Sequence, residues 1–160
     1  MALRGISGSL VSNALLEGEA KLTDAPAELR RIVSAVRQLG PASSARNIFD
    51  ALIGPLLRHF ELEWSIAIDS TPAIVAIVDG RKCHALIVTG GWDADLHELR
   101  RRTARTGERA CRWWIGANGA MLRVLDASRA YTRRALDFDV ALIADNDGAI
   151  GALRHVLQST

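Results

Sequence analysis

Apolar residues recur every three or four positions in two stretches of the first 60 residues, and this spacing predicts two amphipathic helices. The first is expected to follow Asp24, an N-cap residue, and to stop at Gly40-Pro41. The second is expected to run for about fifteen residues from a cap at Ser43 or Ser44, and to bend or break at Pro55. The apolar faces are Leu29, Ile32, Val33, Val36 and Leu39 in the first helix, and Ile48, Phe49, Leu52, Ile53, Leu56 and Leu57 in the second.

Short apolar runs of strand length follow. Residues 64–69, 73–78 and 84–88 are predicted to be three strands, and the turn residues 79–82 join the last two as a hairpin. The third strand is apolar on both faces, which places it in the middle of a sheet, and Gly90-Gly91 ends it.

The next stretch has the order strand, helix, strand. A helix capped by Asp93 or Asp95 is expected to reach about residue 106 on a thin apolar stripe, and a strand is expected from Cys111 to Ala117. A connection of this length predicts a βαβ unit whose two strands are parallel neighbours.

The rest of the chain predicts a hairpin and a last helix. Asn118-Gly119 is a hairpin turn that leads into a return strand at 121–125, followed by a short strand at 136–140 and a helix from about Asp145. The expected fold class is therefore α/β, a mixed sheet flanked by helices with one βαβ crossover and an N-terminal helical pair. We expect one domain over 1–160, with a helical extension over 1–42 and a core over 43–160.

Composition narrows the class of protein. A chain of 160 residues that is 49% hydrophobic can bury a sizeable core. Its first ten residues lack the apolar run of a signal peptide, and its apolar runs are too short to cross a membrane, so we expect a cytoplasmic protein. Two cysteines, Cys83 and Cys111, are too few for a disulfide framework or a four-ligand zinc site, and both are expected as buried thiols in strands.

Charge is unevenly distributed along the chain. The net charge is +2, and only Lys21 and Lys82 are lysines among the 20 basic residues. The span from His97 to Arg134 contains ten arginines and three acidic residues, so it has a charge of +7 and leaves −5 for the rest. Such a segment could bind phosphates, while a solvated helix face is the alternative. The candidate phosphate contacts are Arg101, Arg105, Arg109 and Arg112, with Arg133 and Arg134 as lesser candidates.

Other chemistry-bearing residues give weaker signals. His59, His84, His97 and His155 are scattered singly, which favours structural or solvated roles over metal binding. Gly90-Gly91 fits no phosphate-binding loop. Trp113 and Trp114 should face opposite sides of the sheet, so one is expected in the core and the other under a helix or on the surface, where a base could stack on it.

Three segments together resemble a known family. They are GPASSAR with LIGPLL (40–46 and 52–57), RWWIGANGAMLRVLDA (112–127) and SRAYTRRALDFDV (128–140). Their order and spacing resemble the N-terminal domain of type IIG-like restriction–modification enzymes, which is similar to the PD-(D/E)XK nucleases. The resemblance implies a restriction-endonuclease-like sheet, with residues 43–160 as the nuclease-like core.

The resemblance also shows where nuclease residues would lie. The acidic residue that follows proline would fall at Pro72-Ala73, and the D/E-x-K step would fall between Val88 and Gly91, yet neither place holds an acidic residue or a lysine. This implies a pseudo-nuclease of a restriction–modification or phage-defence system, without a cofactor, that binds DNA non-specifically or supports a DNA methyltransferase domain or subunit.

Two alternatives remain open. The chain could be an interaction or dimerisation module without DNA binding, in which the N-terminal segment and the last helix form a homodimer contact. It could instead be a Mg²⁺-dependent DNA endonuclease with a relocated active site, for which the candidate carboxylates are Asp69, Asp79 and Asp93.

Overall fold

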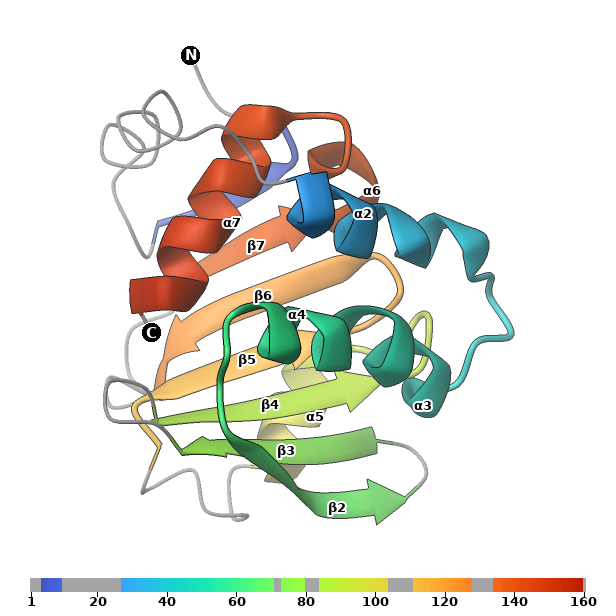
Figure 1. Cartoon of the computed structure of the whole chain (residues 1–160). Helices are drawn as coiled ribbons and strands as arrows, with labels where there is room; N and C mark the ends of the chain where they lie inside the picture. Colours follow the sequence, from blue (N-terminus) through green and yellow to red (C-terminus); the bar gives the residue numbers. More distant parts are fainter. Residues whose placement is uncertain are drawn as a thin grey trace.

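The fold is a seven-stranded mixed sheet with helices on both faces (Figure 1). It is seen in a computed structural model that describes residues 4–9, 27–70, 73–79, 84–103, 111–127 and 134–159. The strand order is β1-β7-β6-β5-β4-β3-β2; β4 and β5 are parallel, and all the other neighbours are antiparallel. The strands are β1 (Ile6–Gly8), β2 (Trp64–Ser70), β3 (Ala73–Asp79), β4 (His84–Gly90), β5 (Trp113–Ala117), β6 (Met121–Asp126) and β7 (Ala135–Asp139).

Most of the helices cover one face of the sheet, and α5 lies alone among the described helices on the other (Figure 1). The elements of the first face are α2 (Ala27–Ala35) with the 3₁₀ turn η1 (Val36–Gln38), α3 (Ala45–Ile48), the π-helical turn η2 (Phe49–Ile53), α4 (Gly54–His59), α6 (Val140–Ile143) and α7 (Asp147–Ser159). Helix α5 (Leu96–Thr103) connects β4 to β5, so the predicted parallel βαβ unit is confirmed.

Alternation along the central strands divides the core into two layers. Ala85 and Ile87 of β4 pack under the larger group of helices, whereas Leu86 and Val88 pack under α5. Trp113 and Trp114 divide in the same way: Trp114 is fully buried on the α5 side, and Trp113 is half-buried against the other layer. The prediction that one tryptophan enters the core is therefore confirmed.

The second predicted helix is continuous from α3 through η2 to α4. Ser44 is its cap: its side chain accepts a hydrogen bond from the Asn47 backbone, and the Asn47 side chain accepts one from the Ser44 backbone. The π turn ends two residues before Pro55, and its wide hydrogen bond runs from the Gly54 N–H to the Phe49 carbonyl. Pro55 lies in the first turn of α4, where its missing N–H is tolerated. The predicted irregularity is thus accommodated as a wider turn rather than as a break.

The structure adds two elements to those predicted and decides between the two predicted caps of α5. Strand β1, which pairs with β7 at the sheet edge, and the short helix α6 were not predicted. Asp95, not Asp93, caps α5 by accepting from two backbone N–H groups of the first turn. The apolar face of α7 packs inside the chain's own core, and the homodimer contact stays a prediction.

The boundary predicted after residue 42 stays a prediction. Helix α2 contributes Leu29, Ile32 and Val33 to the same core cluster as α4. Among the described residues, no helix is long and apolar enough to span a membrane.

Candidate nucleic-acid interface

Helix α5 presents its arginines outward because its inner face is fixed in three places. Leu96 and Leu99 are buried against the sheet. The buried Thr103 hydroxyl donates to the Leu99 carbonyl at 2.9 Å and accepts from the Trp114 indole N–H at 3.2 Å. With these positions inward, Arg101 and Arg102 are left on the exposed side of the helix.

Two arginines of α5 share one carboxylate. Glu98 accepts from Arg101 Nε at 2.8 Å and Nη2 at 3.0 Å, and from Arg102 Nε at 2.9 Å. These hydrogen bonds from Arg101, then from Arg102, lower the Glu98 pKa to about 2. The cluster of two guanidinium groups and one carboxylate therefore has an excess positive charge at neutral pH.

A hollow of about 580 Å³ lies between α5 and the strands β6, β7 and β1. Its polar centre is Arg123, whose Nε and Nη2 donate to the two oxygens of Asp137 at 2.7 and 2.9 Å. The hydrogen bonds to Asp137 raise the Arg123 pKa. The described lining residues are Gly8, Ser9, Leu96, His97, Arg100, Arg123, Leu125, Arg134, Ala135 and Asp137.

Positive charge exceeds negative charge on this face. The basic face is defined here as α5 and the hollow beside it, and its arginines outnumber its carboxylates. A surface with excess guanidinium groups attracts polyanions and offers N–H donors to their phosphates. The five described arginines are Arg100, Arg101, Arg102, Arg123 and Arg134; the three carboxylates are Asp95, Glu98 and Asp137.

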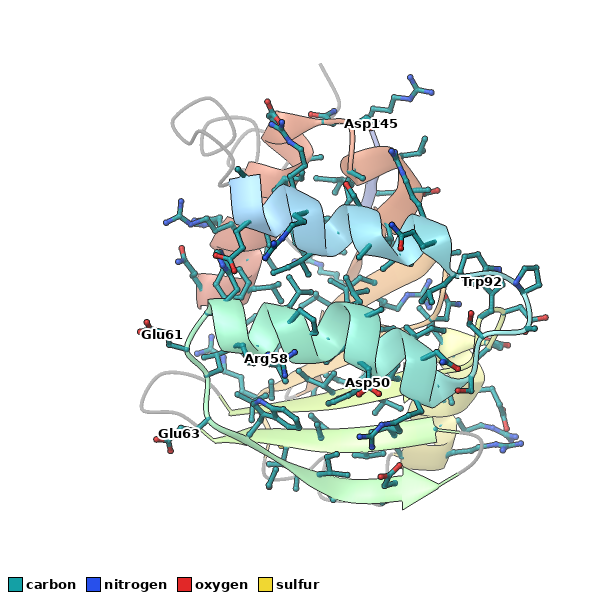
Figure 2. The ribbon with its side chains drawn as sticks, turned by 45° about the vertical axis from the view of Figure 1, so that its right-hand side comes forward. Asp50, Arg58, Glu61, Glu63, Trp92 and Asp145 are labelled. Carbon is teal, nitrogen blue, oxygen red and sulfur yellow. The ribbon has the colours of Figure 1, made fainter. Side chains whose placement is uncertain are left out.

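Charges on the opposite face are matched instead. Arg37 binds Asp145, and Arg30 binds Asp147, so both arginines tie η1 and α2 to the last helices. Arg46 contacts the carboxylates of Asp50 at 3.0 Å and Asp69 at 2.9 Å. Figure 2 shows Asp50 and Arg58 on the outer side of the α3–α4 segment, with Glu61 and Glu63 where the chain leaves it. This face has no comparable excess of arginine among the described residues.

The structure places the six predicted phosphate contacts in different surroundings. Arg134 is exposed and lines the hollow, and Arg101 lies on the basic face in the Glu98 cluster. Arg112 is exposed, and its guanidinium lies 5.2 Å from the centroid of the Trp113 ring. Arg105, Arg109 and Arg133 lie outside the described residues.

Sequence reasoning missed Arg100, Arg123 and Asp137 as parts of this face. Arg123 and Asp137 are directly opposite in the β6–β7 register. Pairing the predicted strands at 121–125 and 136–140 would have placed opposite charges side by side, which is the signal that could have found them.

The candidate carboxylates do not converge. Asp69 lies beside the β2–β3 turn and pairs with Arg46, and Asp93 is exposed in the turn after β4, at the same end of the sheet. Asp79 is the last residue of β3, opposite His84, at the other end. Six residues of strand separate the two ends, or about 20 Å, which is too far for one metal ion. Within the described part of the chain, no group of three His, Cys, Asp or Glu residues could hold a metal.

The two expected registers of the nuclease motif differ in packing. The lysine would fall on Gly90 in one register and on Gly91 in the other, where a Cβ would lie in ordinary contact, 3.7 Å from the Ser43 carbonyl oxygen. A Cβ on Gly90 would lie 2.5 Å from Ala94 Cβ and 2.6 Å from Leu99 Cδ1, so no side chain fits there without a shift. The neighbouring Thr89 is fully buried, and its hydroxyl has no hydrogen-bond partner.

The single histidines and the cysteines form no site in the described residues. His59 Nδ1 is 3.5 Å from Glu28, and His97 is exposed on α5. Cys111 is buried and forms no disulfide, but it lies two residues before β5 rather than in the strand as predicted. Cys83 lies outside the described residues.

Comparison with known proteins gives no relative. No family model matches the chain, and neither a curated protein nor a solved structure matches it significantly.

Proposed function

We propose that this chain is a nuclease-like domain without nuclease chemistry that binds DNA non-specifically through its basic face. The single observation that carries the proposal is the unequal distribution of charge between the two faces. Arg30, Arg37 and Arg46 have carboxylate partners on the helical face, whereas five arginines gather with three carboxylates around α5 and its hollow. Duplex DNA presents one phosphate charge about every 1.7 Å along its axis, so it suits a surface with repeated guanidinium donors.

The contacts on this face suit phosphates rather than base edges. Guanidinium groups on an exposed helix can track the backbone, and such contacts position DNA without reading its sequence. The nuclease-like part of the proposal is supported by the mixed sheet with one βαβ crossover. The absence of nuclease chemistry is supported by residues 72–73 and 88–91, which include no acidic residue and no lysine. Membership of a restriction–modification or phage-defence system rests on the sequence resemblance.

Fluorescence anisotropy with a labelled DNA duplex over a salt series tests the proposal. We expect binding at low salt that weakens steeply as salt rises, because each phosphate contact releases counterions. The double variant Arg101→Glu/Arg134→Glu should bind at least about tenfold more weakly than the wild type, which corresponds to about 1.4 kcal/mol.

The matched control is Arg31→Glu on α2, where the side chain is 80% exposed on the opposite face. It makes the same kind of charge reversal but should leave the affinity close to wild type. No binding at low salt, or equal weakening by the control, would refute the DNA role.

A further inference from the structure

We propose that the hollow beside α5 binds a terminal phosphate group, a phosphomonoester, presented by a nucleic-acid strand or by a free nucleotide. The inference deepens the proposed function, on which it rests, because it assigns the hollow a ligand that a simple basic surface would not select. It is carried by the fixed orientation of Arg123, the charge of the lining and the size of the hollow.

Asp137 holds Arg123 in one orientation. The pair is bidentate and half-buried: the side chains are 31% exposed for Arg123 and 16% for Asp137. A guanidinium has five N–H donors, and this pair engages two of them, so three donors are not used by Asp137. A guanidinium already fixed in place loses less conformational entropy when it binds a phosphate.

The charge of the lining matches a phosphomonoester better than an internal phosphodiester. Three arginines and one carboxylate among the described lining residues give a net charge of about +2, leaving His97 aside. A phosphomonoester has a charge of about −1.5 to −2 at neutral pH and three strong acceptor oxygens. A phosphodiester inside a strand has a single negative charge per phosphate, so it would leave part of this charge unmatched.

The size and the lining residues of the hollow favour recognition of the phosphate rather than the base. Its volume of about 580 Å³ lies within the range of small-molecule sites. Leu96, Leu125 and Ala135 provide an apolar wall against which a sugar could pack. The described lining residues include no Phe, Tyr or Trp ring to stack on a base and no Asn or Gln amide to read adenine. Arginines can read guanine edges, and in this proposal they engage the phosphate instead.

The experiment compares two single-stranded oligonucleotides of the same sequence, one with a 5′-phosphate and one with a 5′-hydroxyl, by anisotropy competition. The phosphorylated strand should displace a labelled single strand from the wild-type chain at a concentration at least about tenfold lower than the hydroxyl strand needs. Adenosine and guanosine monophosphate are added as competitors, and both should compete equally because no base is read. If the phosphorylated strand competes more strongly than the nucleotides, the ligand of the hollow is the end of a strand. If the two compete equally, the ligand is a free nucleotide.

Two variants separate positioning from simple charge. Asp137→Asn removes a negative charge, so a purely electrostatic surface would then bind both strands more tightly. If Asp137 positions Arg123, the variant should instead lose the preference for the phosphorylated strand. Arg134→Gln should weaken, but not abolish, the preference for the phosphorylated strand. Arg31→Gln, on the opposite face, should leave this preference unchanged. Circular dichroism confirms that each variant is folded.

The two proposals can fail separately. If duplex binding persists but the phosphorylated and hydroxyl strands compete equally, the terminal-phosphate site is refuted and the DNA-binding face remains. If the monophosphates and the phosphorylated strand bind while duplex does not, the hollow is supported and the DNA role fails. If nothing binds, both proposals fail.

Discussion

Two buried threonines on opposite sides of the sheet differ in how their hydroxyl groups are satisfied. Thr103 connects α5 to Trp114 through hydrogen bonds, whereas the Thr89 hydroxyl is buried without a partner. Valine has nearly the same shape as threonine, so the same substitution removes a satisfied polar group at one site and an unsatisfied one at the other.

The free energy of unfolding should therefore change in opposite directions. Thr103→Val leaves the Trp114 indole N–H unpaired in the core, and we expect a loss of about 1–3 kcal/mol. Thr89→Val removes an unpaired hydroxyl and should raise the stability by about 1 kcal/mol. Urea unfolding followed by tryptophan fluorescence measures both; a loss of stability in Thr89→Val would show that its hydroxyl is hydrogen-bonded.

Gly116 is required by the packing of the same tryptophan. A Cβ at this position would lie 2.2 Å from the Trp114 ring, which is fully buried and cannot withdraw. We expect Gly116→Ala to destabilise the fold by about 1–3 kcal/mol through overpacking. Gly40→Ala is the control, because a Cβ there meets nothing within 4 Å. Equal midpoints for both variants in urea would contradict the close contact.

At the scale of elements, α5 is stabilised by its Glu98 cluster in a pH-dependent way. The folded pKa of Glu98, about 2, lies below its ordinary value of 4.5, so the folded state favours the charged carboxylate. The contribution to stability is complete above pH 4.5 and is lost as the pH falls towards 2. Asp145 behaves in the same direction, because hydrogen bonds from Arg37 lower its pKa.

Thermal unfolding of the wild type and of Glu98→Gln at pH values from 7 to 2 measures this contribution as a difference in melting temperature. The wild type should melt higher at neutral pH, and the difference should disappear near pH 2. Arg101→Gln and Arg102→Gln should each remove only part of it, because the other arginine still binds Glu98. A difference that stays constant from pH 7 to pH 2 would show that the cluster does not stabilise α5.

Elements with strong local signals were predictable from the sequence. The alternation and the turn at Asn118-Gly119 predict β5 and β6, and Ser44 and the apolar spacing predict the α3–α4 segment. The elements that were missed are short and depend on distant partners. Ile6–Gly8 has no strand pattern of its own and becomes β1 only by pairing with β7, and α6 is a single turn capped by Asp139.

The candidate site was predictable only in part for the same reason. The arginine-rich span was visible in composition, but Arg123 and Asp137 become a pair only when β6 and β7 align. A run of arginines on α5 also does not show which of them share Glu98. The distribution of charge along the sequence therefore indicates the arginine-rich segment. The ion pairs formed in the folded chain determine where on the surface the excess positive charge lies.

At the scale of the whole molecule, the sheet separates two surfaces with different chemistry. The layer that contains α2, α4 and α7 holds the larger core cluster, and its surface arginines Arg30 and Arg37 are paired with acids. Among the described helices, α5 alone covers the other face of the sheet (Figure 1). The hollow that contains Arg123 lies beside this helix. Among the described residues, arginines outnumber carboxylates on the basic face, whereas carboxylates outnumber arginines in the remainder.

The most direct test of the DNA-binding face is a titration of the ¹⁵N-labelled chain with a short duplex, followed by backbone amide chemical shifts. We expect salt-sensitive shifts in α5, in β6 around Arg123 and at Arg134, with α2 and α4 unchanged. Shifts centred on α2 and α4, or none at low salt, would contradict it.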